Sequence, residues 1–165
     1  YLVEALLADN LKDDLYSSFA TIYLSPKDYH RIHMPFDGRL KSMKYIPGSL
    51  FSVNQRTVKD IDQVFARNER LICNFNTEYG EIALVMVGAI FVGSMETSWE
   101  GQVTPPYTKS VKTYDYDSRQ IDLSKGEELG RFNMGSTVIL LMPKGSPDLN
   151  LETGQVLKMG QSISN

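Results

Sequence analysis

The sequence predicts a mainly β fold, a single sandwich-like or barrel-like domain with a few short helices. Many short segments rich in β-branched and aromatic residues are separated by Gly, Pro and other turn residues. No alternation of strands with long helices, which would build a parallel sheet, is visible. The 165 residues, 42% hydrophobic and 22% charged, are enough for one real core. We therefore expect residues 1–165 to form one domain.

The expected strands follow one another along most of the chain. They are Phe19–Leu24, Arg39–Ile46, Arg70–Phe75, Ile82–Val92, Lys109–Tyr116, Leu129–Phe132 and Ser136–Met142. Leu71, Cys73 and Phe75 alternate on one face, which is typical of a half-buried strand. Ile82–Val92 is the longest apolar run, and its eleven residues are too few to span a bilayer.

Three short helical segments are expected. One is predicted by the roughly helical spacing of Leu2, Leu6, Leu7, Leu11 and Leu15. Ser25-Pro26-Lys27-Asp28 is typical of a helix start, with the serine as cap and the proline at the first helical position, and Pro35 would end that helix. Thr57-Val58-Lys59-Asp60 resembles a capping box that opens a helix through Ile61, Val64 and Phe65.

Composition excludes several classes of function. Seventeen basic and twenty acidic residues give a net charge of −3, which leaves no broad positive surface for nucleic acid. The same balance gives no general attraction to an anionic membrane, so any lipid contact has to be local. Cys73 is the only cysteine, which excludes an intrachain disulfide and a cysteine-rich metal site and fits a cytoplasmic compartment.

The only two histidines, His30 and His33, lie three positions apart. On a helical turn the two rings would share one face, and imidazole is the side chain best able to exchange protons near neutral pH. The residues alone leave open that both rings cap the turn or form hydrogen bonds in the core. A metal site would need a third ligand from elsewhere, and nothing in the sequence points to one.

Glycine–serine pairs occur four times, so the pair itself identifies no nucleophile. They are Gly48-Ser49, Gly93-Ser94, Gly135-Ser136 and Gly145-Ser146. Gly135-Ser136 differs in context, because a turn-like Asn133-Met134 leads through it into an apolar strand. A glycine at this position permits backbone angles closed to other residues, and Ser136 would be fixed at the start of a buried strand. An ordinary turn into a strand explains the same pattern.

Five blocks of the sequence form a larger pattern. They are Tyr23–Pro35, Pro47–Asn54, Phe65–Arg70, Val87–Ala89 with Val92–Thr97, and Gly130–Val138. In this order they resemble the phosphatidylserine decarboxylases of prokaryotic type. Met134-Gly135-Ser136-Thr137 is similar to that family's Leu-Gly-Ser-Thr self-cleavage motif, with a volume-conserving methionine for leucine.

The resemblance implies a pyruvoyl enzyme. In this family the serine hydroxyl attacks the carbonyl group of the preceding glycine, and β-elimination then breaks the chain and leaves a pyruvoyl group. The resemblance places the cut between Gly135 and Ser136, which gives a β chain of residues 1–135 and an α chain of residues 136–165. Ser136 would become the covalent pyruvoyl cofactor, and His33 matches the family histidine that acts as the base.

The resemblance also implies decarboxylation of phosphatidylserine to phosphatidylethanolamine and CO2 through a Schiff base. His30 matches the family's other histidine, which we assign to proton transfer or carboxylate handling. The expected partners are phosphatidylserine, an anionic membrane surface and the α/β heterodimer, alone or as a homodimer of heterodimers; nucleic acid is not expected. The expected location is peripheral, on the cytoplasmic side of the cell membrane.

The family places an aspartate of its catalytic triad, and helices that dock on membranes, upstream of the segment that matches Tyr1. We therefore expect the chain to be the core of a longer precursor. Asp37-Gly38 follows the histidines and does not match the family's Asp-Gly motif. Two other hypotheses stay open. One is a pyruvoyl decarboxylase for a small soluble amino acid, and the other is an unprocessed β-barrel module that binds lipid without catalysis.

Overall fold

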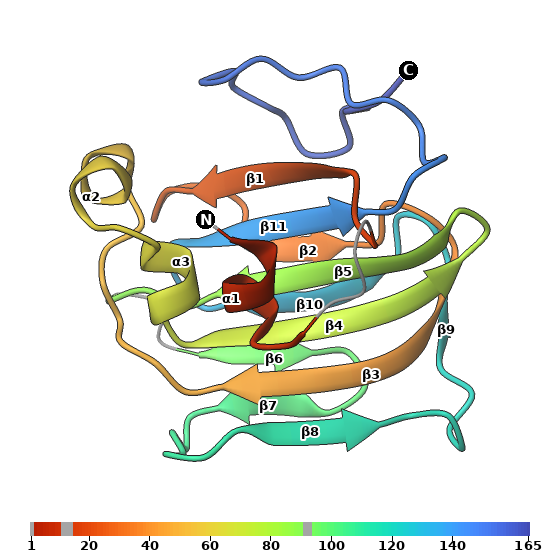
Figure 1. Cartoon of the computed structure of the whole chain (residues 1–165), viewed down its shortest axis with the longest axis horizontal. Helices are drawn as coiled ribbons and strands as arrows, with labels where there is room; N and C mark the ends of the chain where they lie inside the picture. Colours follow the sequence, from red (N-terminus) through yellow and green to blue (C-terminus); the bar gives the residue numbers. More distant parts are fainter. Residues whose placement is uncertain (1, 11–14, 91–93) are drawn as a thin grey trace.

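Two antiparallel sheets make up most of the computed structural model, which describes residues 2–10, 15–90 and 94–165 (Figure 1). The larger sheet contains, in spatial order, β1 (Ser18–Leu24), β11 (Ser136–Met142), β5 (Gly80–Val87), β4 (Arg70–Thr77), β3 (Gly38–Ile46) and β8 (Lys112–Asp115), and β9 (Asp122–Leu123) also pairs with β3. The smaller sheet contains β2 (Arg31–His33), β10 (Glu128–Phe132), β6 (Met95–Thr97) and β7 (Gly101–Thr104). The predicted mainly β fold is confirmed, and the sheets do not close into a barrel.

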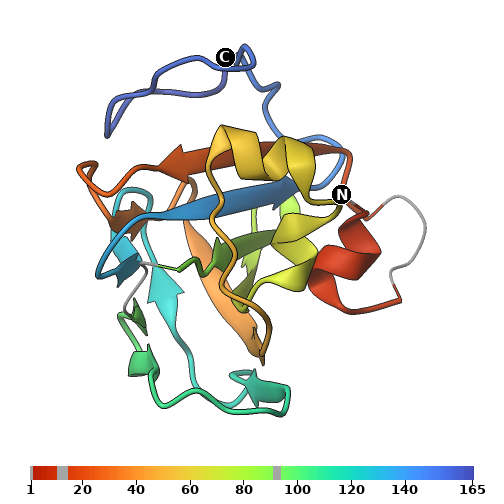
Figure 2. The ribbon, with the colours of Figure 1, turned by 90° about the vertical axis from the view of Figure 1, so that its left-hand side faces the viewer.

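The described part of the chain has three short helices. They are α1 (Val3–Leu7), α2 (Gln55–Asp60) and α3 (Val64–Arg67). Figures 1 and 2 show α1 and α3 against one face of the larger sheet, while the smaller sheet lies on the other side. None of the described helices is both long enough and apolar enough to cross a membrane.

The first half of strand β4 is buried on both faces. Phe75 packs edge-on against the ring of Trp99, between β6 and β7, with 5.9 Å between the ring centroids, so one face of β4 looks toward the smaller sheet. Arg70 and Ile72, on the opposite face, are also buried, and Arg70 binds backbone carbonyls of α1. The prediction of a half-buried strand is therefore wrong for the first half of β4, where α1 covers the second face, and holds for the second half, where Asn76 is exposed.

Strand β11 lies inside the larger sheet, between β1 and β5 (Figure 1). Its seven residues are all buried. Ser136 stands opposite Leu24 of β1, and Thr137 stands opposite Val87 of β5. The neighbouring strand expected over Ile82–Val92 ends at Val87, and Phe91 and Val92 lie outside the described residues.

The segment Ser25-Pro26-Lys27-Asp28 forms a turn, and the helix predicted there is wrong. The Asp28 carboxylate accepts hydrogen bonds from the backbone N–H and the hydroxyl group of Ser25, both at 2.8 Å. The Asp28 N–H donates in return to the Ser25 carbonyl, at 2.9 Å. The bonds that would cap a helix are used within the turn, and the chain continues into β2.

The other helices also differ from the prediction. Asn54, not Thr57, caps α2, because its side chain accepts the Thr57 N–H at 3.0 Å. A left-handed Gln63, with a φ of 52°, separates α2 from α3. At the N-terminus, Leu6 and Leu7 lie in α1, Leu2 is its N-cap, Leu15 lies in no helix and Leu11 is outside the described residues. The short strands β2, β6, β7 and β9 were not predicted.

Candidate functional site at the start of strand β11

Ser136 is the first residue of β11 and is fully buried. Its hydroxyl group has no hydrogen-bond partner among the described residues. Val138, two residues further on, stands opposite Met86, which stands opposite Leu71 on the face of β4 that looks toward the smaller sheet. Residues opposite one another or two apart share a face of a sheet, so Ser136 also points into the interior between the two sheets.

Gly135 lies against the ring of Pro26. A Cβ atom added at Gly135 would lie 3.2 Å from the N, Cγ and Cδ atoms of Pro26, closer than side chains ordinarily pack. Its φ is not in the left-handed region, so Gly135 does not use the positive φ that a glycine permits. A glycine is needed here because of the close approach of the proline ring. Pro26 was not predicted as a site residue.

His30 lies beside this pair. Its Nε2–H donates a 3.2 Å hydrogen bond to the Pro26 carbonyl, and its own carbonyl accepts the Phe132 N–H at 3.0 Å. A carbonyl group can only accept, so Nε2 carries the proton and the Nδ1 lone pair is available. Nδ1 is buried and has no partner among the described residues. Pro26 contacts both His30 and Gly135, so a single residue separates this unused acceptor from the Gly135–Ser136 bond.

His33 has partners for both ring nitrogens. Its Nδ1–H donates to the Gly126 carbonyl at 2.7 Å, and its Nε2 accepts the Tyr29 hydroxyl at 2.8 Å. The Tyr29 and His33 rings are stacked, with 5.7 Å between their centroids. His33 thus has a fixed tautomer whose basic nitrogen is Nε2.

The two histidines do not share one face of a helix, and that prediction is wrong. Arg31–His33 is a strand paired with β10, so His30 reaches Pro26 while His33 reaches Gly126, next to the beginning of β10. The structure links His30 to Gly135 through Pro26, which contacts both residues. It describes no hydrogen bond between His33 and Ser136.

A buried polar cluster lies at the beginning of β4, in Asn68, Glu69 and Arg70. Asn68 Nδ2 donates to the carbonyl groups of Phe51 and Gly88, both at 2.8 Å. Glu69 Oε2 accepts the Tyr45 hydroxyl at 2.9 Å. Burial raises the pKa of Glu69, and hydrogen bonds from Tyr45 and Thr104 reduce that rise. Sequence analysis found these residues only as a block, because nothing in their types indicates where they point.

The chemistry that this interior offers is that of a nucleophilic serine with nearby proton acceptors. A buried hydroxyl group directly follows a glycine carbonyl group, and two imidazoles and a buried carboxyl group belong to the surrounding segments. Among the residues that the structure describes, no group of three or more His, Cys, Asp or Glu side chains is placed to hold a metal ion.

Comparison with known proteins adds independent information. The family model of phosphatidylserine decarboxylase matches residues 1–165. The phosphatidylserine decarboxylase proenzyme of Francisella philomiragia is 54% identical over 148 residues, which are 88% of this chain and 52% of that protein. The proenzyme of Methylococcus capsulatus is 47% identical over 168 residues, 99% of this chain and 58% of the relative. That of Escherichia coli is 49% identical over 173 residues, which cover 99% of this chain and 54% of the relative.

The chain spans about half the length of the curated relatives that it matches. Their names describe proenzymes, that is, precursors of an active form.

Proposed function

The chain belongs to the phosphatidylserine decarboxylase family, and from this premise we propose that it cleaves itself between Gly135 and Ser136 and then decarboxylates phosphatidylserine to phosphatidylethanolamine. The observation that carries the proposal is the Ser136 hydroxyl group, which is fully buried and has no described partner, directly after a glycine held against Pro26. A buried hydroxyl group without a hydrogen bond is costly, so its retention favours a chemical role.

In the first reaction the Ser136 hydroxyl attacks the Gly135 carbonyl carbon. The contact of Gly135 with Pro26 restricts the position of that carbonyl group, and the β11 ladder restricts the serine, so the two groups meet with little loss of freedom. The base that the family pattern assigns is His33. Its Nε2 is the nitrogen able to accept a proton, because Nδ1–H is used on Gly126.

The second reaction needs an electron sink, and a pyruvoyl group made from Ser136 supplies one for a substrate that carries an amine. The residues around position 136 fit such a small group, since the interior there is buried and holds an unused acceptor, His30 Nδ1. We assign His30 to proton transfer or to handling the substrate carboxylate. Pro26 positions it by accepting its Nε2–H.

The two products of cleavage would stay together as an α/β heterodimer. The α chain of residues 136–165 begins with β11, which is paired with β1 on one side and β5 on the other. Both neighbours belong to residues 1–135, so the cut removes one covalent bond and leaves two hydrogen-bonded ladders in place. A homodimer of such heterodimers is a further part of the proposal.

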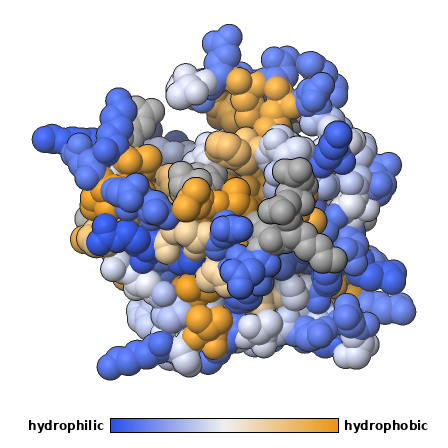
Figure 3. Space-filling view, in the orientation of Figure 1, coloured by the Kyte–Doolittle hydropathy of each residue, from blue (hydrophilic) through white to orange (hydrophobic). Residues whose placement is uncertain are grey.

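The proposed substrate is an anionic membrane lipid, and we propose that the protein meets it at an anionic membrane surface, peripherally and on the cytoplasmic side. The face seen in Figure 3 carries hydrophilic residues interspersed with separate apolar groups. Tyr107 and Val111, in the β7–β8 connection, have exposed apolar side chains that offer local contacts with lipid. Such local contacts are needed because the net charge of −3 gives no general attraction to an anionic membrane.

Intact-mass measurement tests the first reaction. The protein is expressed with whatever sequence its gene encodes on either side, and two fragments divided between Gly135 and Ser136 are expected, the smaller without a free amine. Ser136→Ala is expected to stay uncut. Ser146→Ala is the matched control, because Ser146 also follows a glycine and has a buried hydroxyl group without a described partner; it is expected to cleave normally.

A substrate panel tests the second reaction. The cleaved protein is expected to release CO2 from dispersed phosphatidylserine and not from free serine or other water-soluble amino acids. Activity on the soluble amines alone would favour a small-molecule decarboxylase. A single uncut chain that binds lipid vesicles would favour a binding module.

A further inference from the structure

We propose that Glu69 is the base that removes the α-proton of residue 136 during self-cleavage. This inference rests on the proposed function and deepens it, because it assigns a residue to the elimination step. His33 is assigned to the hydroxyl proton, which passes on to the departing nitrogen of residue 136, and elimination then requires a proton acceptor that faces the α-carbon.

The register of three strands places Glu69 and Ser136 in one row. Thr137 stands opposite Val87, and Val87 stands opposite Arg70. Continued by one residue beyond these last pairs, the same register places Gly88 between Ser136 on one side and Glu69 on the other. The Gly88 N–H donates to the Glu69 carbonyl at 2.8 Å, which shows that the pairing with β4 continues to this step. Members of such a row point to the same face, here the interior between the sheets.

Gly88 places no side chain of its own between Ser136 and Glu69. A Cβ atom added at Gly88 would lie 3.3 Å from Glu69 Oε1, so the carboxyl group reaches over the glycine. A side chain at position 88 would occupy this space and separate the carboxyl group from residue 136. The row therefore contains a hydroxyl group, a position without a side chain and a carboxyl group, in that order, with the Leu50 Cδ2 methyl 3.4 Å from where the missing Cβ would lie.

The backbone of Gly88 also shows where the α-hydrogen of Ser136 points. The N–H of Gly88 is used on Glu69, and its carbonyl accepts Asn68 Nδ2 at 2.8 Å, so both polar groups are turned toward the β4 side. In an antiparallel ladder the opposite side of such a residue makes a pair without hydrogen bonds, in which the two α-carbons approach to about 4.5 Å and the α-hydrogens face each other. The α-hydrogen of Ser136 is thus directed at Gly88, over which the Glu69 carboxyl group lies.

The surroundings of Glu69 suit a base. None of the ion pairs among the described residues includes Glu69. No paired cation therefore stabilises its carboxylate and weakens it as a base. Burial raises the pKa of Glu69, which makes its carboxylate a better proton acceptor. The Tyr45 hydroxyl fixes Oε2 at 2.9 Å, and Oε1 is the oxygen nearest to Gly88.

After the Ser136 oxygen has displaced its own nitrogen from Gly135, an ester joins the Gly135 carbonyl carbon to the Ser136 oxygen. Glu69 takes the α-proton, the electron pair of that C–H bond forms the Cα–Cβ double bond, and the Cβ–O bond breaks. Gly135 leaves as a carboxylate and the chain is cut. The protonated Glu69 can return its proton to Cβ, after which water replaces the nitrogen and ammonia leaves.

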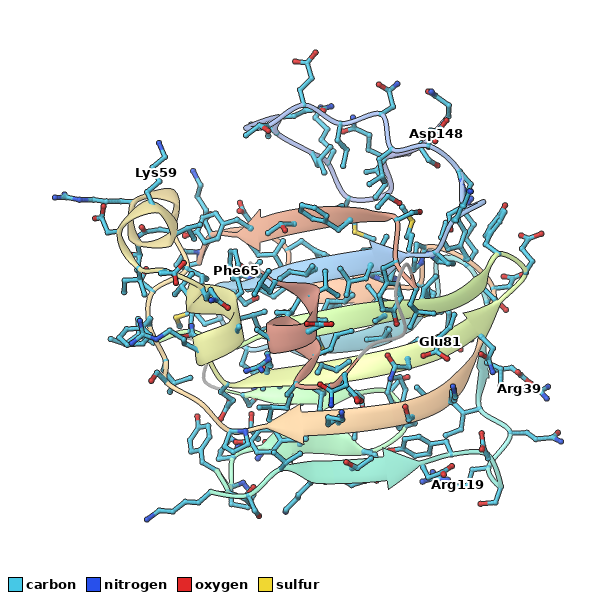
Figure 4. The ribbon with its side chains drawn as sticks, viewed as in Figure 1. Arg39, Lys59, Phe65, Glu81, Arg119 and Asp148 are labelled. Carbon is cyan, nitrogen blue, oxygen red and sulfur yellow. The ribbon has the colours of Figure 1, made fainter. Side chains whose placement is uncertain are left out.

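Glu69→Gln tests the role, because the amide keeps the size of the side chain and can still accept the Tyr45 hydroxyl. We expect formation of the ester without elimination, with cleavage slowed at least about a hundredfold. Hydroxylamine added to the denatured protein would then cut the chain at the ester and release a small fragment that begins with unmodified Ser136. Glu81→Gln is the matched control, and normal cleavage is expected. Glu81 lies near the start of β5. Figure 4 shows it at the opposite end of the sheet from Phe65 of α3, the helix that directly precedes Glu69 in the chain.

Two outcomes with Glu69→Gln overturn the proposal: cleavage at the normal rate, and an uncut chain that resists hydroxylamine. Circular dichroism and thermal unfolding establish that the variant folds. If it does not fold, Glu69→Asp replaces it. We then expect slowed cleavage and an ester that hydroxylamine traps during the time course. Normal cleavage, or slowed cleavage without a trapped ester, overturns the proposal. Failure of the unsubstituted protein to cleave would instead contradict the proposed function itself.

Discussion

The Arg70 guanidinium donates a 2.6 Å hydrogen bond from Nε to the backbone carbonyl of Leu6, in the last turn of α1. The same group reaches the carbonyl groups of Ala5 and Asn68, each at 3.0 Å. Burial lowers the pKa of Arg70 to about 10, still above neutral pH, so the group is a buried cation. It satisfies carbonyl groups at the negative end of a helix and fastens the N-terminal segment to β4.

Arg70→Met is expected to destabilise the fold by about 3 kcal/mol or more, because it leaves buried carbonyl groups without partners. The measurement is urea unfolding in the Ser136→Ala background, which keeps the chain in one piece. Arg56→Met is the control. The Arg56 side chain is 93% exposed and its nearest carboxylate, Asp60, is 3.9 Å away, so a change below about 0.5 kcal/mol is expected. Equal losses in the two variants would contradict the anchoring role.

Gly135→Ala is expected to slow self-cleavage by about tenfold or more, because the added methyl group displaces the scissile carbonyl group from the Pro26 ring. Adding Pro26→Ala to this variant removes the obstructing ring and should restore part of the rate. Quantified gels over a time course give the four rates of the double-mutant cycle. Strict additivity of the two effects would show that the contact is unimportant.

The stability of the uncut protein should depend on pH through Glu69. Burial raises its pKa above the ordinary value of 4.5, so the folded state binds more protons than the unfolded state as pH rises past 4.5. The free energy of unfolding therefore falls over that window and levels off above the folded-state pKa. In the Ser136→Ala background, Glu69→Gln should lack this fall, so its stability relative to the parent should increase from pH 4 to pH 7. A difference independent of pH would contradict the raised pKa.

The two histidines are expected to separate the two reactions. His33→Gln should leave the chain uncut, because the hydroxyl proton then has no acceptor. His30→Gln should be cut and yet have a decarboxylation rate lower by about a hundredfold or more. Intact mass and CO2 release give the two readouts. The reverse pattern would move the base for cleavage to His30, which bonds to Pro26, the residue against which Gly135 lies.

Local sequence was sufficient for the longer strands. β1, β3, β4, β10 and β11 lie where alternating or continuous apolar residues predicted them. β2, β6, β7 and β9 are two to four residues long and carry no pattern of their own. They are strands only because a neighbouring strand offers hydrogen bonds. The turn at Ser25 shows the same limit, since its capping residues bond within the turn and no helix follows.

The sequence by itself determined the β class, the family through its ordered blocks, and Ser136, His30 and His33 as the residues to consider, because residue type and spacing carry that information. Only the tertiary structure decided that Pro26 lies against Gly135, that the histidines point to different partners, and that Glu69 lies in the row of Ser136 with Gly88 between them. The physical reason is that these relationships depend on how segments far apart in the chain pair across a sheet, where a shift of one residue would turn every side chain to the other face.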